Sequence, residues 1–342
     1  MERRRIIFSA CVGMALVMIS QAAMAQYQLT NLVSNQVGAA THTDPLLVNA
    51  WGLTYGPGGP FWVSDEGSGW STLYDALGRK QGLQVVVPSA SGQGPGSPTG
   101  IVFNGSQDFQ VQGWAAFFLF ATLDGTISGW APQSNPNQAI IAVDNSGKGA
   151  SYTGLAITSN ASGNFLFAAD NANNKVDMYD GNFNLVGTLT DSTIPAGFAP
   201  FGIQDLNGLV YVSYASTAGA TGGYIDIFSE SGAFLKRLTQ GSPLNQPWGF
   251  AAAPNTFGPL SNTLLISNNI NNNSAINAFN AITGQFVGKI KDTSGNIIHI
   301  DQLWGIAFGG GTSSNGSKSE LFFTAGPKNN LAGTFGVIRF KP

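Results

Sequence analysis

The sequence contains few of the residue types on which most enzymes rely. Among 342 residues there are one cysteine and two histidines, and charged residues make up 10% of the chain, against roughly 25% in an average soluble protein. Cys11 lies in an N-terminal segment that we expect to be removed on export. A disulfide, a thiolate metal site and a cysteine nucleophile are therefore excluded from the mature chain. The G-x-S-x-G motif of serine hydrolases with a nucleophile elbow is also missing.

Positive charge is scarce, and this excludes nucleic acid as a partner. Fifteen Lys and Arg residues oppose 18 Asp and Glu residues, which gives a net charge of −3. No run of basic residues follows residue 5. Binding to a phosphate backbone requires a basic surface, and this composition offers none.

A long apolar run occurs only near the N-terminus. Arginines at positions 3–5 precede IIFSACVGMALVMI, and the segment 23–25, AMA, forms a small-x-small cleavage site. The pattern predicts a signal peptide over residues 1–25 that directs export through the Sec pathway or, alternatively, the twin-arginine pathway. No later run approaches the about 20 apolar residues that a membrane span requires. We therefore expect an exported protein without a membrane span, located in the periplasm or outside the cell.

Helical periodicity is absent after this segment, and a short glycine motif recurs instead. A glycine preceded by an aromatic residue or Thr and followed by an apolar or aliphatic residue occurs six times, 47 to 56 residues apart. The copies read AWGLTY, PTGIVF, YTGLAI, PFGIQD, PWGFAA and LWGIAF. A period of this length indicates a repeat architecture in which each copy is one supersecondary unit.

Each copy continues as further short apolar runs separated by Gly, Asn, Asp, Ser and Pro turns, which is typical of a four-stranded antiparallel sheet. Radial packing of six such sheets buries their faces and protects their edges. The sequence therefore predicts an all-β, six-bladed β-propeller as a single domain over residues 26–342. The last copy lacks a fourth strand, and we expect the segment 28–36 to supply it and close the ring. A linear solenoid is the alternative, but it needs polar capping repeats that the sequence does not contain.

The third copy, TGLAI followed by GNFLFAADNANNKVDMYDGN, resembles an NHL repeat. The order of all six copies is similar to an uncharacterised family of exported bacterial propellers, some of which carry PEP-CTERM tails. This resemblance implies a fold and an exported location, without implying a reaction. The chain is also similar to gluconolactonase-type six-bladed propellers, which hold a divalent cation with Glu, Asn and Asp and open lactones. At the places beside the inner-strand glycine where that family commonly has Asn or Asp, this sequence has Trp, Thr and Phe.

Numbering the strands of a blade a to d from the axis outward, the d–a and b–c loops share one face of the disc. The a–b and c–d turns share the other. Trp51, Trp248 and Trp304 directly precede repeat glycines, so we expect them to ring the channel mouth at the first face. With Asn49 nearby, they are the candidate ligand-binding residues, because indoles stack on flat apolar ligand surfaces. The alternative is that they pack between blades.

Oxygen-bearing side chains recur where the second strand of alternate blades is expected to end. Asp65, Asp170 and Asn268 occupy these positions in copies one, three and five. Carboxylate and amide oxygens are the ligands that Ca²⁺ selects, so these three residues are the candidate metal ligands for Ca²⁺ or another divalent cation. The alternative is that each accepts backbone N–H groups of the following turn.

The candidates for acid–base catalysis are few. His42 and His299 are the only histidines, and both are expected in d–a loops of the same face. Paired with a nearby carboxylate such as Asp301 or Glu66, either histidine is a candidate general base. The alternative is that both are solvated loop residues.

These observations favour a binding or scaffold module that recognises a small molecule, a carbohydrate or a protein partner at the channel mouth, with no required cofactor. The alternative is a metal-dependent hydrolase similar to the lactonases, or an NHL-type lyase, using a cation at the channel. The sequence leaves open whether the protein is an enzyme. We expect a monomer.

Overall fold

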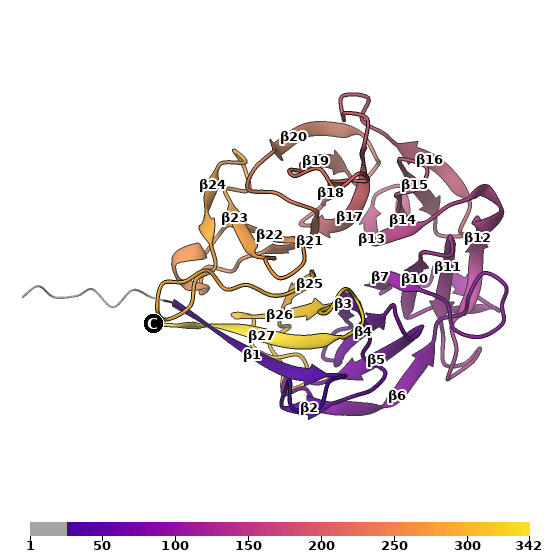
Figure 1. Ribbon diagram of the computed structural model, residues 1–342. Coiled ribbons are helices and arrows are strands. Elements are labelled where there is room, and N and C mark those ends of the chain that lie inside the picture. The colour runs from indigo at the N-terminus through magenta and orange to yellow at the C-terminus, as the bar shows by residue number, and fades with distance from the viewer. Residues whose placement is uncertain (1–25) are drawn as a thin grey trace, which may run out of the picture.

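The computed structural model describes residues 26–342, and it has the predicted architecture. Six antiparallel sheets stand around a central axis as the blades of a propeller (Figure 1). Five sheets have four strands, and the last carries a fifth strand at its outer edge. The predicted signal peptide, residues 1–25, lies outside the described residues. From residue 26 to residue 342, no helix is both long and apolar enough to cross a membrane.

The first three blades follow one another along the chain, each from strand a to strand d. Blade one comprises β3 (Ala50–Tyr55), β4 (Phe61–Asp65), β5 (Trp70–Tyr74) and β6 (Lys80–Val86). Blade two comprises β7 (Pro98–Phe103), β10 (Phe118–Thr122), β11 (Thr126–Trp130) and β12 (Ile140–Asp144). Blade three comprises β13 (Tyr152–Asn160), β14 (Gly163–Asp170), β15 (Lys175–Asp180) and β16 (Leu185–Leu189).

The remaining blades complete the ring. Blade four comprises β17 (Phe198–Leu206), β18 (Leu209–Ser216), β19 (Tyr224–Ser229) and β20 (Phe234–Gln240). Blade five comprises β21 (Pro247–Ala252), β22 (Leu264–Asn268), β23 (Ile276–Phe279) and β24 (Phe286–Lys289). Blade six comprises β25 (Leu303–Phe308), β26 (Glu320–Ala325), β27 (Thr334–Lys341) and β1 (Gln26–Ser34), with β2 (His42–Thr43) outside β1. The loops hold a small hairpin, β8 (Gln110–Val111) with β9 (Trp114–Ala115), and two 3₁₀ helices, η1 (Ser146–Lys148) and η2 (Gly258–Leu260).

The N-terminal strand closes the ring, as the missing fourth strand of the last copy predicted. β1 pairs antiparallel with β27 from Gln26 opposite Lys341 to Ser34 opposite Thr334, with one irregularity after Asn31. In Figure 1 the indigo β1 lies beside the yellow β27, so the two ends of the described chain share one sheet. The paired segment, residues 26–34, starts and ends two residues earlier than the predicted segment 28–36.

The apolar runs of strands b are buried because each blade is covered on both faces. In β14, Leu166, Phe167, Ala168 and Ala169 are all buried. Successive strand residues point to opposite faces of a sheet. Leu166 and Ala168 accordingly pack in the core between blades two and three, and Phe167 and Ala169 in the core between blades three and four. A continuous apolar run is thus what a strand between two neighbours requires.

The repeated glycine is needed because the innermost strands approach one another closely at the axis. A Cβ added at Gly202 would lie 2.0 Å from the carbonyl oxygen of Trp248 in the next blade. One added at Gly52 would lie 2.3 Å from that of Thr99. Any side chain at these positions would push neighbouring backbones apart, so close packing explains the motif.

A side-chain hydroxyl joins neighbouring blades next to three of these glycines. The Ser267 hydroxyl accepts a hydrogen bond from the Gly249 N–H (2.8 Å) and donates to the Trp304 carbonyl oxygen (2.7 Å). Ser213 and Thr324 make the corresponding contacts from blades four and six. We call each of these bridging hydroxyls a hydroxyl clamp. The clamps link the b strand of one blade to the innermost strand of the next.

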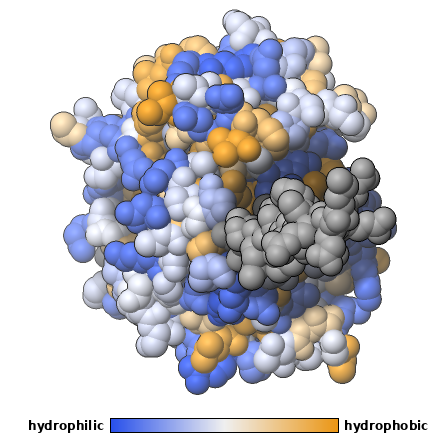
Figure 2. Space-filling model, turned by 90° about the vertical axis from the view of Figure 1, so that its left-hand side faces the viewer, coloured by the Kyte–Doolittle hydropathy of each residue, from blue (hydrophilic) through white to orange (hydrophobic). Residues whose placement is uncertain are grey.

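The rim of the disc exposes scattered apolar side chains from the outermost strands. Seen from the side of β24, the surface is mostly hydrophilic, with apolar residues in small separate groups (Figure 2). Phe286 and Val287 on that strand are 43% and 50% exposed. The channel opens at two ends, which we call the b–c face and the a–b face after their loops.

Candidate functional site

The three candidate tryptophans meet at the axis on the b–c face. Trp51, Trp248 and Trp304 are 5%, 9% and 3% exposed and form one cluster. The rings of Trp51 and Trp304 are stacked with centroids 3.7 Å apart, and the Trp248 ring stands edge-on to both. Phe201 and Leu123 pack against the cluster. These side chains fill the mouth of the channel rather than standing around it.

Hydrogen bonds hold two of the three indoles in place. Trp248 Nε1 donates to the Thr153 carbonyl oxygen at 2.9 Å, which joins blade five to blade three across the axis. Trp304 Nε1 donates to Asn49 Oδ1 at 2.9 Å. Trp51 Nε1 is buried and has no hydrogen-bond partner among residues 26–342.

Asn49 also contacts Glu66, so a candidate ligand-binding residue and a candidate catalytic residue lie side by side. Asn49 is 1% exposed, and its Nδ2 donates to Glu66 Oε2 at 2.7 Å. The left-handed backbone of Asn49, with φ of 47°, occurs in the loop before β3. Asn is one of the residues that adopts this conformation with least strain. Glu66 is therefore held at the edge of the tryptophan cluster.

The candidate metal ligand Asp65 is turned into blade one. It is fully buried, and its Oδ2 accepts a hydrogen bond from the Thr72 hydroxyl at 2.7 Å. The same hydroxyl contacts the hydroxyl of Tyr74, which in turn donates to Asp44. Burial raises the pKa of the Asp65 carboxyl well above its usual value, and the nearby Asp44 raises it further. A group in this environment favours the protonated form over the form that binds cations.

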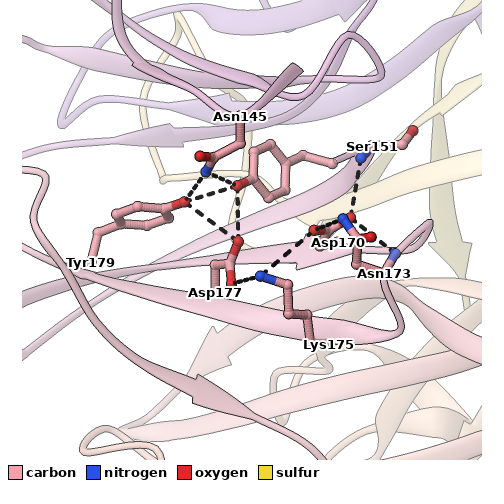
Figure 3. Close-up of polar contacts among 8 residues, drawn as sticks. Asn145, Ser151, Asp170, Asn173, Lys175, Asp177 and Tyr179 are labelled. Atoms are coloured by element: carbon pink, nitrogen blue, oxygen red, sulfur yellow. Dashed lines mark hydrogen bonds and ion pairs between the residues drawn. The ribbon is translucent and has the colours of Figure 1, made fainter. Parts of the chain in front are cut away.

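Asp170, the second candidate ligand, caps a turn in blade three (Figure 3). Its Oδ1 accepts a hydrogen bond from the Ser151 N–H at 3.1 Å, and its Oδ2 accepts one from Asn173 Nδ2 at 2.8 Å. Lys175 Nζ lies 3.9 Å from Asp170 and 2.6 Å from Asp177. The Asp170 carboxylate is thus committed to neighbouring groups of its own loop region.

Asp177 belongs to a buried network between blades two and three, which Figure 3 shows beside Asp170. The hydroxyl of Tyr152 donates to Asp177 Oδ2 at 2.9 Å, and the Tyr179 hydroxyl lies 2.8 Å from that of Tyr152. Asn145 Nδ2 donates to both tyrosines. Burial raises the pKa of Tyr179 to about 12, so both tyrosines stay neutral at ordinary pH. The network joins two blades and contacts no open channel.

Asn268, the third candidate ligand, ties a loop of blade four to blade five. Its Nδ2 donates to the Pro243 carbonyl oxygen at 2.9 Å, and its Oδ1 accepts a hydrogen bond from the Asn245 N–H at 3.1 Å. The three candidates come from three blades. Over the whole of residues 26–342, no three His, Cys, Asp or Glu side chains gather closely enough to hold a metal ion.

The two histidines take different places. His42 lies in β2, the outermost strand of blade six and the one farthest from the axis in that sheet. His299 is exposed and, together with Asp301, lines a cavity of about 190 Å³ beside Leu29 and Asn31 of β1. Asp301 accepts hydrogen bonds from the backbone N–H groups of Asn272 and Lys328. The structure thus brings His299 and Asp301 to one cavity and leaves His42 at the rim.

The open end of the channel lies on the a–b face, where the sequence offered no candidate. A cavity of about 290 Å³ is lined there by the ends of strands a from blades one, four, five and six. Farther along the axis, between the repeat glycines, the free volume of the channel is only about 20 Å³. This is room for about one water molecule. The lining residues are Leu53, Thr54, Tyr55, Gln204, Leu206, Phe250, Ala251, Ala252, Ile306, Ala307 and Phe308. In the sequence, these mostly apolar residues are indistinguishable from those of any buried strand, so no sequence pattern predicts this cavity.

Comparison with solved structures supports the resemblance to NHL-like propellers. The chain is similar to a streptogramin B lyase, with a TM-score of 0.56 over 94% of this chain and all of that chain, at 11% identity. It is also similar to a gluconolactonase from Xanthomonas campestris, with a TM-score of 0.55 over 86% of this chain and 89% of that one, at 13% identity. At such low identity the likeness concerns the fold alone.

No family model matches the chain, but three relatives are found among proteins named as uncharacterized in Acanthamoeba polyphaga mimivirus. Protein R640 is 32% identical over 72% of this chain and 48% of its own length, and L690 is 28% identical over 92% and 86%. R648 is 31% identical over 92% of this chain and 81% of its own length. These relatives are viral, whereas the sequence pattern indicated bacterial ones. The chain belongs to the propeller family that includes the mimivirus protein R648.

Proposed function

We propose that the chain is a binding module whose ligand enters the channel at the a–b face. The observation that carries this proposal is the contrast between the two ends of the channel. Trp51, Trp248 and Trp304 fill the axis at the b–c face, whereas a cavity of about 290 Å³ remains at the a–b face. A concave hollow lined mainly by hydrophobic residues, with a few polar side chains among them, is the usual form of a small-molecule site.

The lining of this cavity favours binding over catalysis. It contains no Asp, Glu, His, Lys or Arg, and its polar side chains are Thr54, Tyr55 and Gln204. The Tyr55 hydroxyl donates to the Phe308 carbonyl oxygen at 2.9 Å, and burial raises its pKa. General acid–base catalysis needs a group that titrates near the working pH. These features support recognition of an uncharged small molecule.

A lactonase-like metal enzyme is the less favoured alternative. It would need Asp65, Asp170 and Asn268 to share one cation near the axis. Each of these side chains is instead hydrogen-bonded to groups of its own blade or of an adjoining loop. The likeness to lyases and a lactonase is one of fold at 11% and 13% identity, and fold alone does not carry function.

Substitutions that fill the cavity test the binding proposal. Ala252→Trp and Ala307→Trp place indoles in the cavity, and Ala233→Trp, on an exposed turn of blade four, is the matched control. Benzyl alcohol serves as the probe in ligand-observed NMR. We expect the wild type and the control to bind it, and both cavity variants to bind it about tenfold more weakly or less. Unfolding temperatures of all variants report whether the fold is kept.

Equal binding of the probe by all four folded proteins would place it outside the channel and contradict the proposal. Loss of binding in the control as well would mean that the probe responds to surface changes instead of the cavity. A wild type that does not bind benzyl alcohol at all would also count against a preformed binding site at this end of the channel.

We also propose that the protein is exported after removal of residues 1–25. The arginines at 3–5, the apolar run and the AMA segment support this. Every described ladder of β1 begins at Gln26 or later, so cleavage there would spare the ring closure. Intact mass of the product exported by a bacterial host tests the proposal: a periplasmic product starting at Gln26 is expected, and a cytoplasmic full-length product would contradict it.

A further inference from the structure

A cavity separate from the axial one opens on the b–c face between blades four and five. Its volume is about 370 Å³, within the range of roughly 300–1,000 Å³ that small-molecule sites occupy. Its walls are the b–c loop of blade four at Thr221 and Gly222, the loop 241–245 between the two blades, the b–c loop of blade five, and Lys289 at the end of β24. It shares no lining residue with the axial cavity, which opens on the opposite face.

Lys289 carries the one charge of this lining, since the described residues that form it include no other Lys or Arg and no His, Asp or Glu. Lys289 is half-buried, yet it takes part in none of the ion pairs formed within residues 26–342. Charged groups that are withdrawn from water are usually paired in native proteins. A cavity beside this ammonium group therefore suits an anionic ligand.

The same place in blade four shows what Lys289 lacks. Asp226 lies opposite Arg237 in the register of β19 and β20, and the two side chains form an ion pair of 2.7 Å. In blade five the corresponding residues are Asn277 and Lys289, again directly opposite each other. Directly opposed residues point to the same face of a sheet, with Cβ atoms roughly 5 Å apart. Both pairs lie at the same distance from an opposed pair of phenylalanines, Phe228 with Phe234 and Phe279 with Phe286.

The second carboxylate of the blade-four cluster is replaced in the same way. Arg237 also pairs with Asp191, which ends the segment LTD (189–191) after strand d of blade three. After strand d of blade four the same segment reads LTQ (238–240), so Gln240 takes that place. Both counter-ions of Arg237 thus correspond to uncharged amides in the repeat that carries Lys289. Asn277 itself is fully buried, so its contribution is to withhold a charge rather than to contact a ligand.

The uncharged part of the lining suits the hydroxyl groups of a ligand. The side chains of Thr221, Ser242, Asn245 and Asn273 line the cavity and take part in no hydrogen bond within the described chain. Pro243 adds apolar surface beside them. A few polar groups placed around a cavity in this way fix the orientation of a ligand and provide specificity.

We propose that this cavity binds a sugar acid with one carboxylate, such as a hexuronate. Lys289 pairs with its carboxylate, and the four polar side chains exchange hydrogen bonds with its hydroxyl groups. A phosphate ester fits the lining less well, because a dianion would meet a single cation and no Arg fork. The inference is independent of the proposed function, since the two cavities lie on opposite faces and have separate linings.

Three probes separate the contribution of charge from that of shape. Glucuronate carries a carboxylate, glucuronamide carries an uncharged amide at the same carbon, and acetate carries the carboxylate without the sugar. By calorimetry near neutral pH and at low salt we expect glucuronate to bind, and the other two to bind about tenfold more weakly or less. Equal affinity for glucuronamide would overturn the role of charge, and equal affinity for acetate would overturn the assignment to a sugar acid.

Asn277→Asp tests the missing counter-ion directly. It restores the carboxylate that Arg237 has in blade four, so Lys289 is paired from within the chain, and glucuronate binding is expected to weaken about tenfold. Lys289→Gln removes the cation and is expected to weaken binding to the same degree. Lys148→Gln removes one positive charge from the exposed end of η1 and is the matched control, with binding unchanged. Ala252→Trp in the axial cavity also leaves glucuronate binding unchanged, which separates this inference from the proposed function.

Unfolding temperatures show which variants are folded, and Lys289→Gln decides the outcome if Asn277→Asp does not fold. Glucuronate binding that survives Lys289→Gln would place the sugar acid elsewhere. Equal weakening by Lys148→Gln would show that glucuronate responds to net charge alone. Full binding by a folded Asn277→Asp would overturn the argument that the residue opposite Lys289 leaves its charge free for a ligand.

Discussion

The hydroxyl of Tyr27 donates a hydrogen bond of 2.7 Å to the carbonyl oxygen of Phe257, 230 residues later in the chain. Tyr27 lies in β1, whereas Phe257 lies in the loop between the first two strands of blade five. The two rings are also in contact, with centroids 4.7 Å apart. The N-terminal strand therefore joins blade six to blade five in addition to completing the sheet of blade six.

Removing this hydroxyl should weaken the closure of the ring measurably. Tyr27→Phe keeps the ring contact but leaves the Phe257 carbonyl oxygen and the Leu260 N–H without their partner. We expect the free energy of unfolding to fall by about 1 kcal/mol or somewhat more, measured by denaturant unfolding. Tyr211→Phe is the matched control, because the Tyr211 hydroxyl makes no side-chain hydrogen bond within the described residues. A similar loss in both variants would contradict the account.

The tryptophan cluster offers a second matched pair. Trp304→Phe and Trp51→Phe remove the same atoms from buried, stacked rings. Only Trp304 loses a hydrogen bond, the one that its Nε1 donates to Asn49. We expect the unfolding free energy of Trp304→Phe to fall about 1 kcal/mol further than that of Trp51→Phe. Denaturant unfolding measures the difference, near-UV circular dichroism reports the packing, and equal losses would show that this hydrogen bond contributes nothing.

The fold could be predicted from the sequence because its cause repeats. Gly52 and Gly202 lie where the backbones of neighbouring blades nearly touch. Because each innermost strand must approach its neighbour this closely, each copy has a glycine at the same place in its motif. The closing strand was predictable for a related reason: the last copy lacks a strand, and the N-terminal segment has the missing pattern.

The candidate site was less predictable because its chemistry depends on side-chain direction and on partners from other segments. The position of Trp51 before a repeat glycine indicates the channel mouth, but not that its ring stacks on Trp304 and fills that mouth. From the sequence, Asp65 is a plausible metal ligand. In the structure its side chain is fully buried and accepts a hydrogen bond from the Thr72 hydroxyl.

Asp226 should make stability depend on pH in a defined window. It is fully buried and pairs with Arg237, yet burial raises its pKa to about 6, compared with about 3.9 for an unfolded aspartate. As the pH rises from about 4, the unfolded chain loses this proton first, so the free energy of unfolding falls until the folded chain also loses it near pH 6. The pKa of Asp191 is lowered in the folded chain. This carboxyl therefore makes the free energy of unfolding rise with pH, and only below about pH 4.

Asp226→Asn removes this titration. Denaturant unfolding at about pH 4 and about pH 7 should show the wild type losing on the order of 2 to 3 kcal/mol more than the variant between the two conditions. At the lower pH the variant is expected to be about as stable as the wild type, because the Asp226 carboxyl is then protonated in the folded chain and Asn is likewise uncharged. Parallel pH dependence in both proteins would mean that Asp226 ionises in the folded chain as it does in the unfolded one.

The hydroxyl clamps provide a test within equivalent positions of two blades. Ser267 in β22 and Ser64 in β4 are both fully buried and both stand one residue before the end of the second strand. Ser267 clamps Gly249 to Trp304, whereas the Ser64 hydroxyl has no partner within the described chain. Ser267→Ala leaves a buried N–H and a buried carbonyl oxygen unpaired, and we expect it to cost about 1 to 3 kcal/mol. Ser64→Ala removes an unsatisfied polar group of the same size and should leave the free energy of unfolding unchanged or higher, so equal losses by denaturant unfolding would refute the clamp.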